Sequence, residues 1–169
     1  MHRPGHDGAV HALDDQSAAA MWAAFVGAHP EHAGENPAFE RFGDSAEMAD
    51  ELLALVLDGT KRATAGAVVE FRAEDEPLPR IGGLWIVADA QGTARCVLRS
   101  TQLRIGPLDS VDEAFASDEG EGDRTRPWWL EAHRDYFRGS CARLGVEFSD
   151  RLEVVFERFA VVWPEAVAD

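Results

Sequence analysis

A lysine and a threonine three residues apart are the part of this sequence best suited to chemistry. Lys61 is the only lysine among 16 cationic residues, and Thr64 follows it closely. A buried amine can lose its proton and act as a base that activates a hydroxyl as a nucleophile, whereas a guanidinium stays charged. On a regular strand residues 61 and 64 would face opposite sides, so they can converge only across a helical turn or a bulge. The alternative interpretation is a solvated lysine in a loop between a helix and a strand.

A second candidate is the acidic stretch between residues 109 and 123, which contains no cationic residue. Its carboxylates are Asp109, Asp112, Glu113, Asp118, Glu119, Glu121 and Asp123. Most such runs are solvated faces. Gly120 and Gly122, however, allow a sharp bend that points one acid inward, and Arg124 and Arg126 follow as anchors. An inward acid could act as a general acid or base, or hold Lys61 in place.

Aromatic residues form the third candidate. Trp128, Trp129, His133 and Tyr136 fall on one predicted helix near several arginines, an arrangement that can stack a nucleic-acid base. Tryptophans belong more often to the core, and we expect at least one of these two there. One group of residues with metal-binding side chains comprises His29, Glu31, His32 and Glu35. It lies in a predicted loop and lacks a metal-binding motif, so a metal site is not predicted.

Two helices are predicted before Lys61. Apolar residues at helical spacing predict a helix over residues 16–28. A second helix has Asp44 and Glu47 as a capping box and ends at Gly59, which leads the chain into Lys61. Its expected buried stripe comprises Met48, Leu52, Leu55 and Val56.

The second half of the chain predicts strands and two more helices. Residues 84–89 and 94–105 are rich in β-branched and aromatic residues and read as a hairpin. A short helix is expected over 109–117, and a longer one begins after Thr125 with Pro127 in its first turn. The chain ends in a strand over 152–163. Without repeats or linkers, these strands must form one mixed sheet or barrel flanked by helices.

Length and charge limit the class of protein. A chain of 169 residues, 46% of them hydrophobic, is typical of one domain. Its formal net charge of -15 argues against a generic nucleic-acid coat or a basic membrane-surface binder. Cys96 and Cys141 have no metal-binding or disulfide-framework spacing, and no apolar run is long enough to span a membrane. We therefore expect a cytoplasmic protein without a membrane segment.

Several separated blocks of the sequence resemble the bacterial ASCH domain family (activating-signal-cointegrator homology), a branch of the PUA-like superfamily. The blocks are FGDSAEMADELLALVLDGTKRAT, PLPRIGGLWIVAD, CVLRSTQLRIGPLDSVDEAFASDEGEGDR, WWLEAHRDYF and VVFERFAVVW. They run in order from about Phe42 to Trp163. The resemblance implies an α+β fold, a PUA-like small mixed β-barrel flanked by helices, over residues 42–164. Residues 15–41 would be an N-terminal helical extension, and residues 1–14 a disordered tail.

The resemblance also implies a ligand class and a site. Small members of the family are amidohydrolases that remove the acetyl group of N4-acetylcytidine with a Lys, a Thr three residues later and a Glu. These positions fall on Lys61, Thr64 and Glu119, with Glu121 as the alternative acid. Other members are reported as ribonucleases, and many have no known activity.

We therefore expect RNA or a modified nucleoside as the partner, with no cofactor and no metal. The expected ligand-binding residues are Arg62, Arg99, Glu121, Arg124, Trp128 and Tyr136. The hypothesis of a hydrolase acting on a small nucleoside or short RNA stands beside two others, a ribonuclease and a non-catalytic RNA-binding regulatory module. A protein-interaction domain is also compatible with the sequence.

Overall fold

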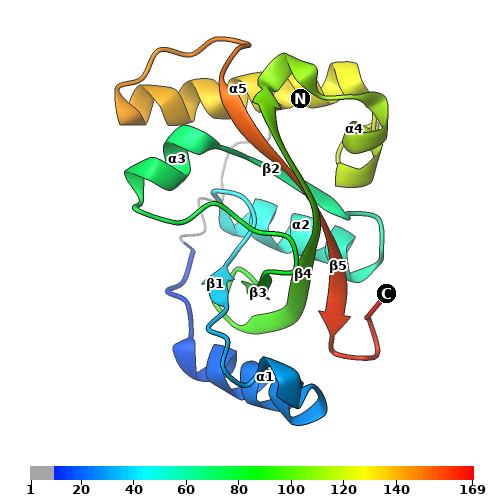
Figure 1. The fold of residues 1–169 in the computed structure, drawn as a ribbon. Coiled ribbons are helices and arrows are strands. Elements are labelled where there is room, and N and C mark those ends of the chain that lie inside the picture. Colours follow the sequence, from blue (N-terminus) through cyan, green and yellow to red (C-terminus); the bar gives the residue numbers. More distant parts are fainter. Residues whose placement is uncertain (1–9) are drawn as a thin grey trace. The chain divides into compact units, whose positions relative to one another are not determined.

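The computed structural model describes residues 10–169, and its five strands are hydrogen-bonded in the order β1-β3-β4-β5-β2 (Figure 1). The strands are β1 (Ala38–Glu40), β2 (Ala63–Ala67), β3 (Leu84–Ala88), β4 (Ala94–Pro107) and β5 (Glu153–Trp163). The helices are α1 (Asp15–Ala28), α2 (Ala46–Leu57), α3 (Val68–Ala73), α4 (Glu113–Glu119) and α5 (Arg126–Leu144). Short 3-10 turns occupy Pro30–His32 and Leu108–Ser110. The expected α+β class with a mixed sheet is confirmed.

The chain forms two compact units. Of the residues that the structure describes, unit 1 contains 10–58, 83–99 and 160–169, and unit 2 contains 59–82 and 100–159. Both β4 and β5 contribute residues to each unit.

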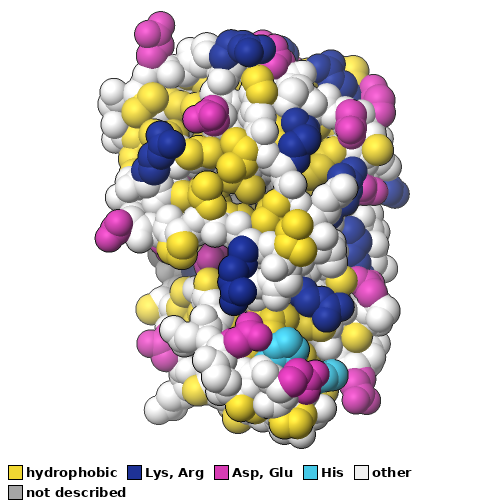
Figure 2. Space-filling view, viewed as in Figure 1, with side chains coloured by type: hydrophobic (Ala, Val, Ile, Leu, Met, Phe, Trp, Pro, Cys, Tyr) yellow, Lys and Arg dark blue, Asp and Glu magenta, His cyan; other side chains and the backbone are white. Residues whose placement is uncertain are grey.

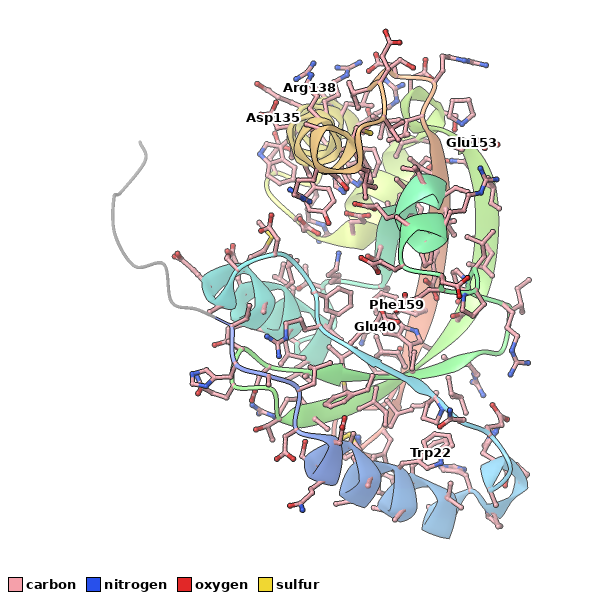
Figure 3. All side chains as sticks on the ribbon, turned by 90° about the vertical axis from the view of Figure 1, so that its left-hand side faces the viewer. Trp22, Glu40, Asp135, Arg138, Glu153 and Phe159 are labelled. Carbon is pink, nitrogen blue, oxygen red and sulfur yellow. The ribbon has the colours of Figure 1, made fainter. Side chains whose placement is uncertain are left out.

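Unit 1 is built on the predicted hairpin. Strand β3 pairs antiparallel with β4, Leu84 opposite Arg99, and parallel with β1, Ala38 opposite Trp85. Helix α1 contributes Phe25 to a buried cluster that includes Ile86 and Val97, and Trp22 of the same helix packs against it (Figure 3). The helix predicted over 16–28 is therefore confirmed, and its apolar residues are what fix it to the sheet.

The chain that precedes α1 has no regular structure in its described part. Residues 1–9 of the expected disordered tail lie outside the described residues. The backbone amides of His11 and Asp14 donate to the carbonyls of Ala90 and Gly92, at 3.2 and 2.9 Å. Residues 10–14 are therefore bonded to the β3-β4 turn.

The N-cap of helix α2 lies one residue after its predicted position. Ser45, not Asp44, is the N-cap residue, because its backbone is extended and its hydroxyl accepts the Met48 amide at 3.2 Å. The predicted capping box is wrong for the same reason. The buried face also differs, since Met48 is 39% exposed and Leu53 is buried in place of Leu55.

In unit 2, strands β2 and β5 pair antiparallel with Ala63 opposite Arg158, and buried residues of α4 and α5 pack with them in one core. The cap at Thr125 predicted for α5 is confirmed. Trp129, Phe137 and Cys141 of this helix are buried, whereas Asp135 and Arg138 form an exposed ion pair (Figure 3). The core of the unit includes Trp129 and Phe137 with Phe115 of α4 and Phe156 of β5.

Candidate active site

Lys61 lies in unit 2, between the end of α2 and the start of β2. Only 1% of its side chain is exposed. The backbone of the next residue is held at both of its polar groups, because the Arg62 amide donates to the Asp118 carbonyl at 2.7 Å and the Phe159 amide donates to the Arg62 carbonyl at 3.0 Å. The predicted alternative of a solvated lysine is therefore wrong.

Two carboxylates surround the Lys61 amine. Lys61 Nζ donates to Glu121 Oε1 at 2.7 Å, and Glu119 Oε2 lies 3.9 Å away. The Glu119 carbonyl oxygen is 3.5 Å from the same amine. Glu119 is as buried as Lys61, whereas the Glu121 side chain is 22% exposed. The expectation that the glycine-rich acidic loop turns an acid toward Lys61 is confirmed by these distances.

The loop geometry that brings these acids inward depends on two glycines. Gly120 follows α4 with φ +74°, and a Cβ there would lie 2.6 Å from the Thr60 carbonyl oxygen. Gly122 has φ +55°, and a Cβ there would overlap the Trp128 ring, with a nearest atom at 2.1 Å. Only glycine allows this close approach of the loop to both neighbours. Trp128 therefore packs over the loop and is half-buried.

His133 joins the same cluster from α5. Its Nε2 lies 3.2 Å from Glu119 Oε2, and its Nδ1 lies 2.8 Å from the Trp129 carbonyl oxygen. The ring stacks on Trp129 at 3.7 Å between centroids. The sequence marks His133 only as an aromatic residue on the same predicted helix as Trp129. Its helical spacing from Trp129 predicts the stacking, but nothing in the sequence indicates the contact with Glu119.

Burial and charge act in opposite directions on this cluster. Burial alone would raise the pKa of Glu119, but the charges of Lys61 and His133, with hydrogen bonding from His133, hold that pKa below its usual range. Burial alone would lower the pKa of His133, but Glu119, Glu121 and the Trp129 carbonyl raise it. The cluster therefore favours an ionised Glu119 and a protonated His133.

Thr64 lies on β2, three residues after Lys61. It is half-buried and directly opposite Glu157 of β5. Lys61 itself precedes β2, so the alternation of side chains along a regular strand does not fix its direction relative to Thr64. Glu157 is buried and accepts a short hydrogen bond from Ser100. Burial raises the pKa of Glu157 and the Ser100 bond opposes that rise.

The structure gives the arginines mostly structural contacts. Arg62 Nη1 donates to the Lys61 carbonyl at 2.8 Å, and Arg124 donates to the carbonyl and hydroxyl oxygens of Ser117. Arg126 donates to the carbonyls of Val111 and Asp109, so the predicted anchoring by Arg124 and Arg126 is confirmed.

The other two expected ligand residues are exposed. Tyr136 of α5 is 37% exposed. Arg99 is exposed on β4 and belongs to unit 1, unlike the other site residues.

The fold and the buried lysine site together define an α+β domain of the PUA-like class. The model of the ASCH domain family matches residues 38–163, and the chain belongs to this family. The family is associated with RNA binding. A search of curated proteins found none that matches. Among the described residues, no helix has the length and apolar character needed to cross a membrane.

Two solved structures are similar to this chain. An ASCH domain from Lactobacillus crispatus is 29% identical with a TM-score of 0.79, covering 90% of this chain and 97% of that one. A protein from Enterococcus faecalis is 30% identical with a TM-score of 0.78, covering 88% of this chain and 90% of that one. Both likenesses extend beyond the residues that the family model matches.

Proposed function

We propose that this protein binds a nucleoside or short RNA at the Lys61 cluster and hydrolyses an acyl amide on the base, with N4-acetylcytidine as the model substrate. The single observation that carries the proposal is the buried amine of the only lysine, bonded to a carboxylate of the glycine-rich acidic loop. The resemblance to the amidohydrolases of the family, described above, supplies the substrate class.

The geometry favours Glu121 over Glu119 as the acid that exchanges a proton with Lys61. Glu121 is the closer carboxylate, at 2.7 Å against 3.9 Å, and it is the one that solvent reaches. A general acid or base must lie within hydrogen-bond reach of the proton that it moves. Glu119, fully enclosed, would hold Lys61 in place.

Thr64 is the proposed nucleophile. Lys61, once it has passed its proton to Glu121, takes the proton of the Thr64 hydroxyl as the oxygen bonds to the acetyl carbon. The bond between that carbon and N4 then breaks, and N4 takes a proton from Glu121. Water hydrolyses the acetyl ester to acetate and restores the hydroxyl. This step requires the Lys61 amine to lie within hydrogen-bond reach of the Thr64 hydroxyl in the ligand complex.

The test is release of cytidine from N4-acetylcytidine by the purified protein. We expect turnover that Glu121→Gln and Lys61→Arg abolish, while Glu131→Gln, a change at an exposed position of α5, leaves it intact. Thr64→Ser should retain activity and Thr64→Val should lose it. Equal turnover by Lys61→Arg would overturn the proposed role of the lysine.

A non-catalytic binding module is the second candidate. The observation that favours it is the Lys61 amine itself, which lies between two carboxylates, 2.7 Å from Glu121 and 3.9 Å from Glu119. This candidate expects binding of cytidine or a short RNA, with no product from either N4-acetylcytidine or a labelled RNA. Degradation of the labelled RNA that Lys61→Arg abolishes would instead identify a ribonuclease.

A further inference from the structure

His133 lies between two hydrogen-bond acceptors. A backbone carbonyl can only accept, so the 2.8 Å contact with the Trp129 oxygen requires a proton on Nδ1. The second ring nitrogen, Nε2, lies 3.2 Å from Glu119 Oε2. An ionised carboxylate can only accept as well, so this contact requires a proton on Nε2. The geometry therefore fits the doubly protonated imidazolium form.

The same carboxylate oxygen of Glu119 faces both cations of the cluster. Oε2 lies 3.2 Å from His133 Nε2 and 3.9 Å from Lys61 Nζ. The other oxygen, Oε1, and the indole nitrogen of Trp129 are both buried, and hydrogen bonding from that indole helps to lower the pKa of Glu119. The polar surroundings of the Glu119 side chain are thus two cationic neighbours and the indole of Trp129.

The cluster is balanced only when His133 is charged. Glu119 of α4 and Glu121 of the following loop act on His133, and Lys61 adjoins both acids. With His133 protonated, two cations face two carboxylates. With His133 neutral, one cation faces two carboxylates in a site whose lysine and Glu119 are each only 1% exposed. An unpaired charge in such surroundings is strongly disfavoured.

We propose that His133 is a positioning residue of the Lys61 site and that its imidazolium holds Glu119 in place. Loss of the His133 proton then disturbs Lys61 and weakens the binding of anionic ligands. The effect on ligands rests on the proposed function. The effect on Lys61 does not, and it can be measured in the free protein.

The first measurement uses the fact that the chain has one lysine. Protein labelled with carbon-13 only in lysine gives a single Cε resonance, which reports on Lys61 alone. We expect this resonance to shift as the pH rises through the titration of His133, and the shift to be absent in His133→Gln. His32→Gln is the matched control, because His32 pairs with Glu35 in unit 1 and should leave the shift unchanged.

The wild-type protein supplies a check that needs no variant to fold. Nitrogen-15 spectra of labelled histidine should show both ring nitrogens of His133 protonated at about pH 7, above the usual histidine midpoint of about 6.5. A neutral His133 at that pH, or a Lys61 resonance indifferent to His133 titration, would overturn the proposal.

The ligand measurement separates this inference from the proposed function. We compare the affinities for cytidine and for a dinucleoside monophosphate from about pH 6 to about pH 9. The charge of the dinucleoside monophosphate is constant over this pH range. We expect the affinity of the charged ligand to fall about tenfold more than that of cytidine, and the difference to vanish in His133→Gln. Parallel affinities would overturn the effect on ligands. If neither ligand binds, the proposed function fails together with this effect, while the two spectroscopic results still decide the positioning role.

Discussion

Lys61 is as buried as the core residues of unit 2, although its side chain ends in an amine. The aliphatic stem of a buried lysine packs as an apolar side chain does. The Lys61 amine at its end is bonded to the carboxylate of Glu121. Such a pair contributes little net stability, because desolvation of both groups offsets their attraction. Removing one partner is costly, because the other charge is then left unpaired.

We therefore expect Lys61→Met to lower the free energy of unfolding by about 3 kcal/mol. The double variant Lys61→Met/Glu121→Gln should recover part of that loss, because it removes the unpaired charge as well. Urea titration of both variants measures the difference. No recovery in the double variant would show that the pair is not energetically coupled.

The burial of Glu157 should make the stability of the protein depend on pH. Because burial raises its pKa in the folded state, its contribution to stability is fully present below the pKa of the unfolded chain and is lost as pH rises through the folded value. A tenfold difference in proton affinity between the folded and unfolded chain is worth about 1.4 kcal/mol. Glu157→Gln should therefore gain stability relative to the wild type between about pH 4 and about pH 8. A constant difference between the two proteins over that range would contradict this expectation.

The residues that the sequence predicts differ from those it misses in how local their signals are. Lys61 is distinctive by its type and Glu121 by its adjacent glycines, so both could be singled out. His133 and Glu157 carry no such mark, because their surroundings come from helix α4 and strand β4, distant in the sequence. Only the fold brings a histidine of α5 to the last residue of α4.

Helix α4 ends at a glycine that leaves room for the backbone of Thr60. Gly120 and Gly145 are both left-handed helix caps, with φ +74° and +67°, but only Gly120 has Thr60 within contact distance of an added Cβ. We expect Gly145→Ala to cost about 1 kcal/mol from strain alone. Gly120→Ala should cost about 3 kcal/mol because it adds a steric overlap with backbone. Thermal unfolding of the pair tests this, and equal losses would refute the role given to the overlap.

Helix α1 lies outside the residues that the family model matches, yet it contributes to the core of unit 1. Phe25 is 2% exposed and stacks with His32 at 5.5 Å between centroids. We expect Phe25→Ala to lower the free energy of unfolding by about 4 kcal/mol. Leu13→Ala, at a position 37% exposed, should change it by less than about 0.5 kcal/mol. Chemical denaturation measures both, and a small loss for Phe25→Ala would mean that α1 is dispensable for this core.

Elements with strong periodicity were predictable, and those that depend on a partner were not. Helices α1, α2 and α5 and the β3-β4 hairpin follow from apolar spacing and caps. Strand β2 has the sequence ATAGA, which has little intrinsic strand preference and is extended because it pairs with β5. Strand β1 and helix α3 are too short to show a periodic pattern, and the sequence does not predict them.

The charge of the whole chain limits how RNA can bind. The net charge is -15, and Figure 2 shows cationic and acidic side chains interspersed over one face of the molecule. A long polyanion would meet repulsion over most of its length, so binding must be local. We expect the affinity for single-stranded RNA to depend weakly on salt, with a logarithmic slope of magnitude about 1, as one or two phosphate contacts give. Fluorescence anisotropy at several salt concentrations measures this slope. A steep dependence would indicate an extended phosphate track.

The turn of the β3-β4 hairpin links two parts of the chain that could otherwise evolve separately. Gly92 has φ +86°, and a Cβ there would lie 2.1 Å from the carbonyl oxygen of Ala12. Any side chain at this turn would displace the segment that leads into α1. Family members that keep this leading segment should therefore retain glycine at the turn, whereas members that have lost it are released from the steric part of that constraint. The identity of one turn residue thus becomes a sequence marker for a docked N-terminal extension.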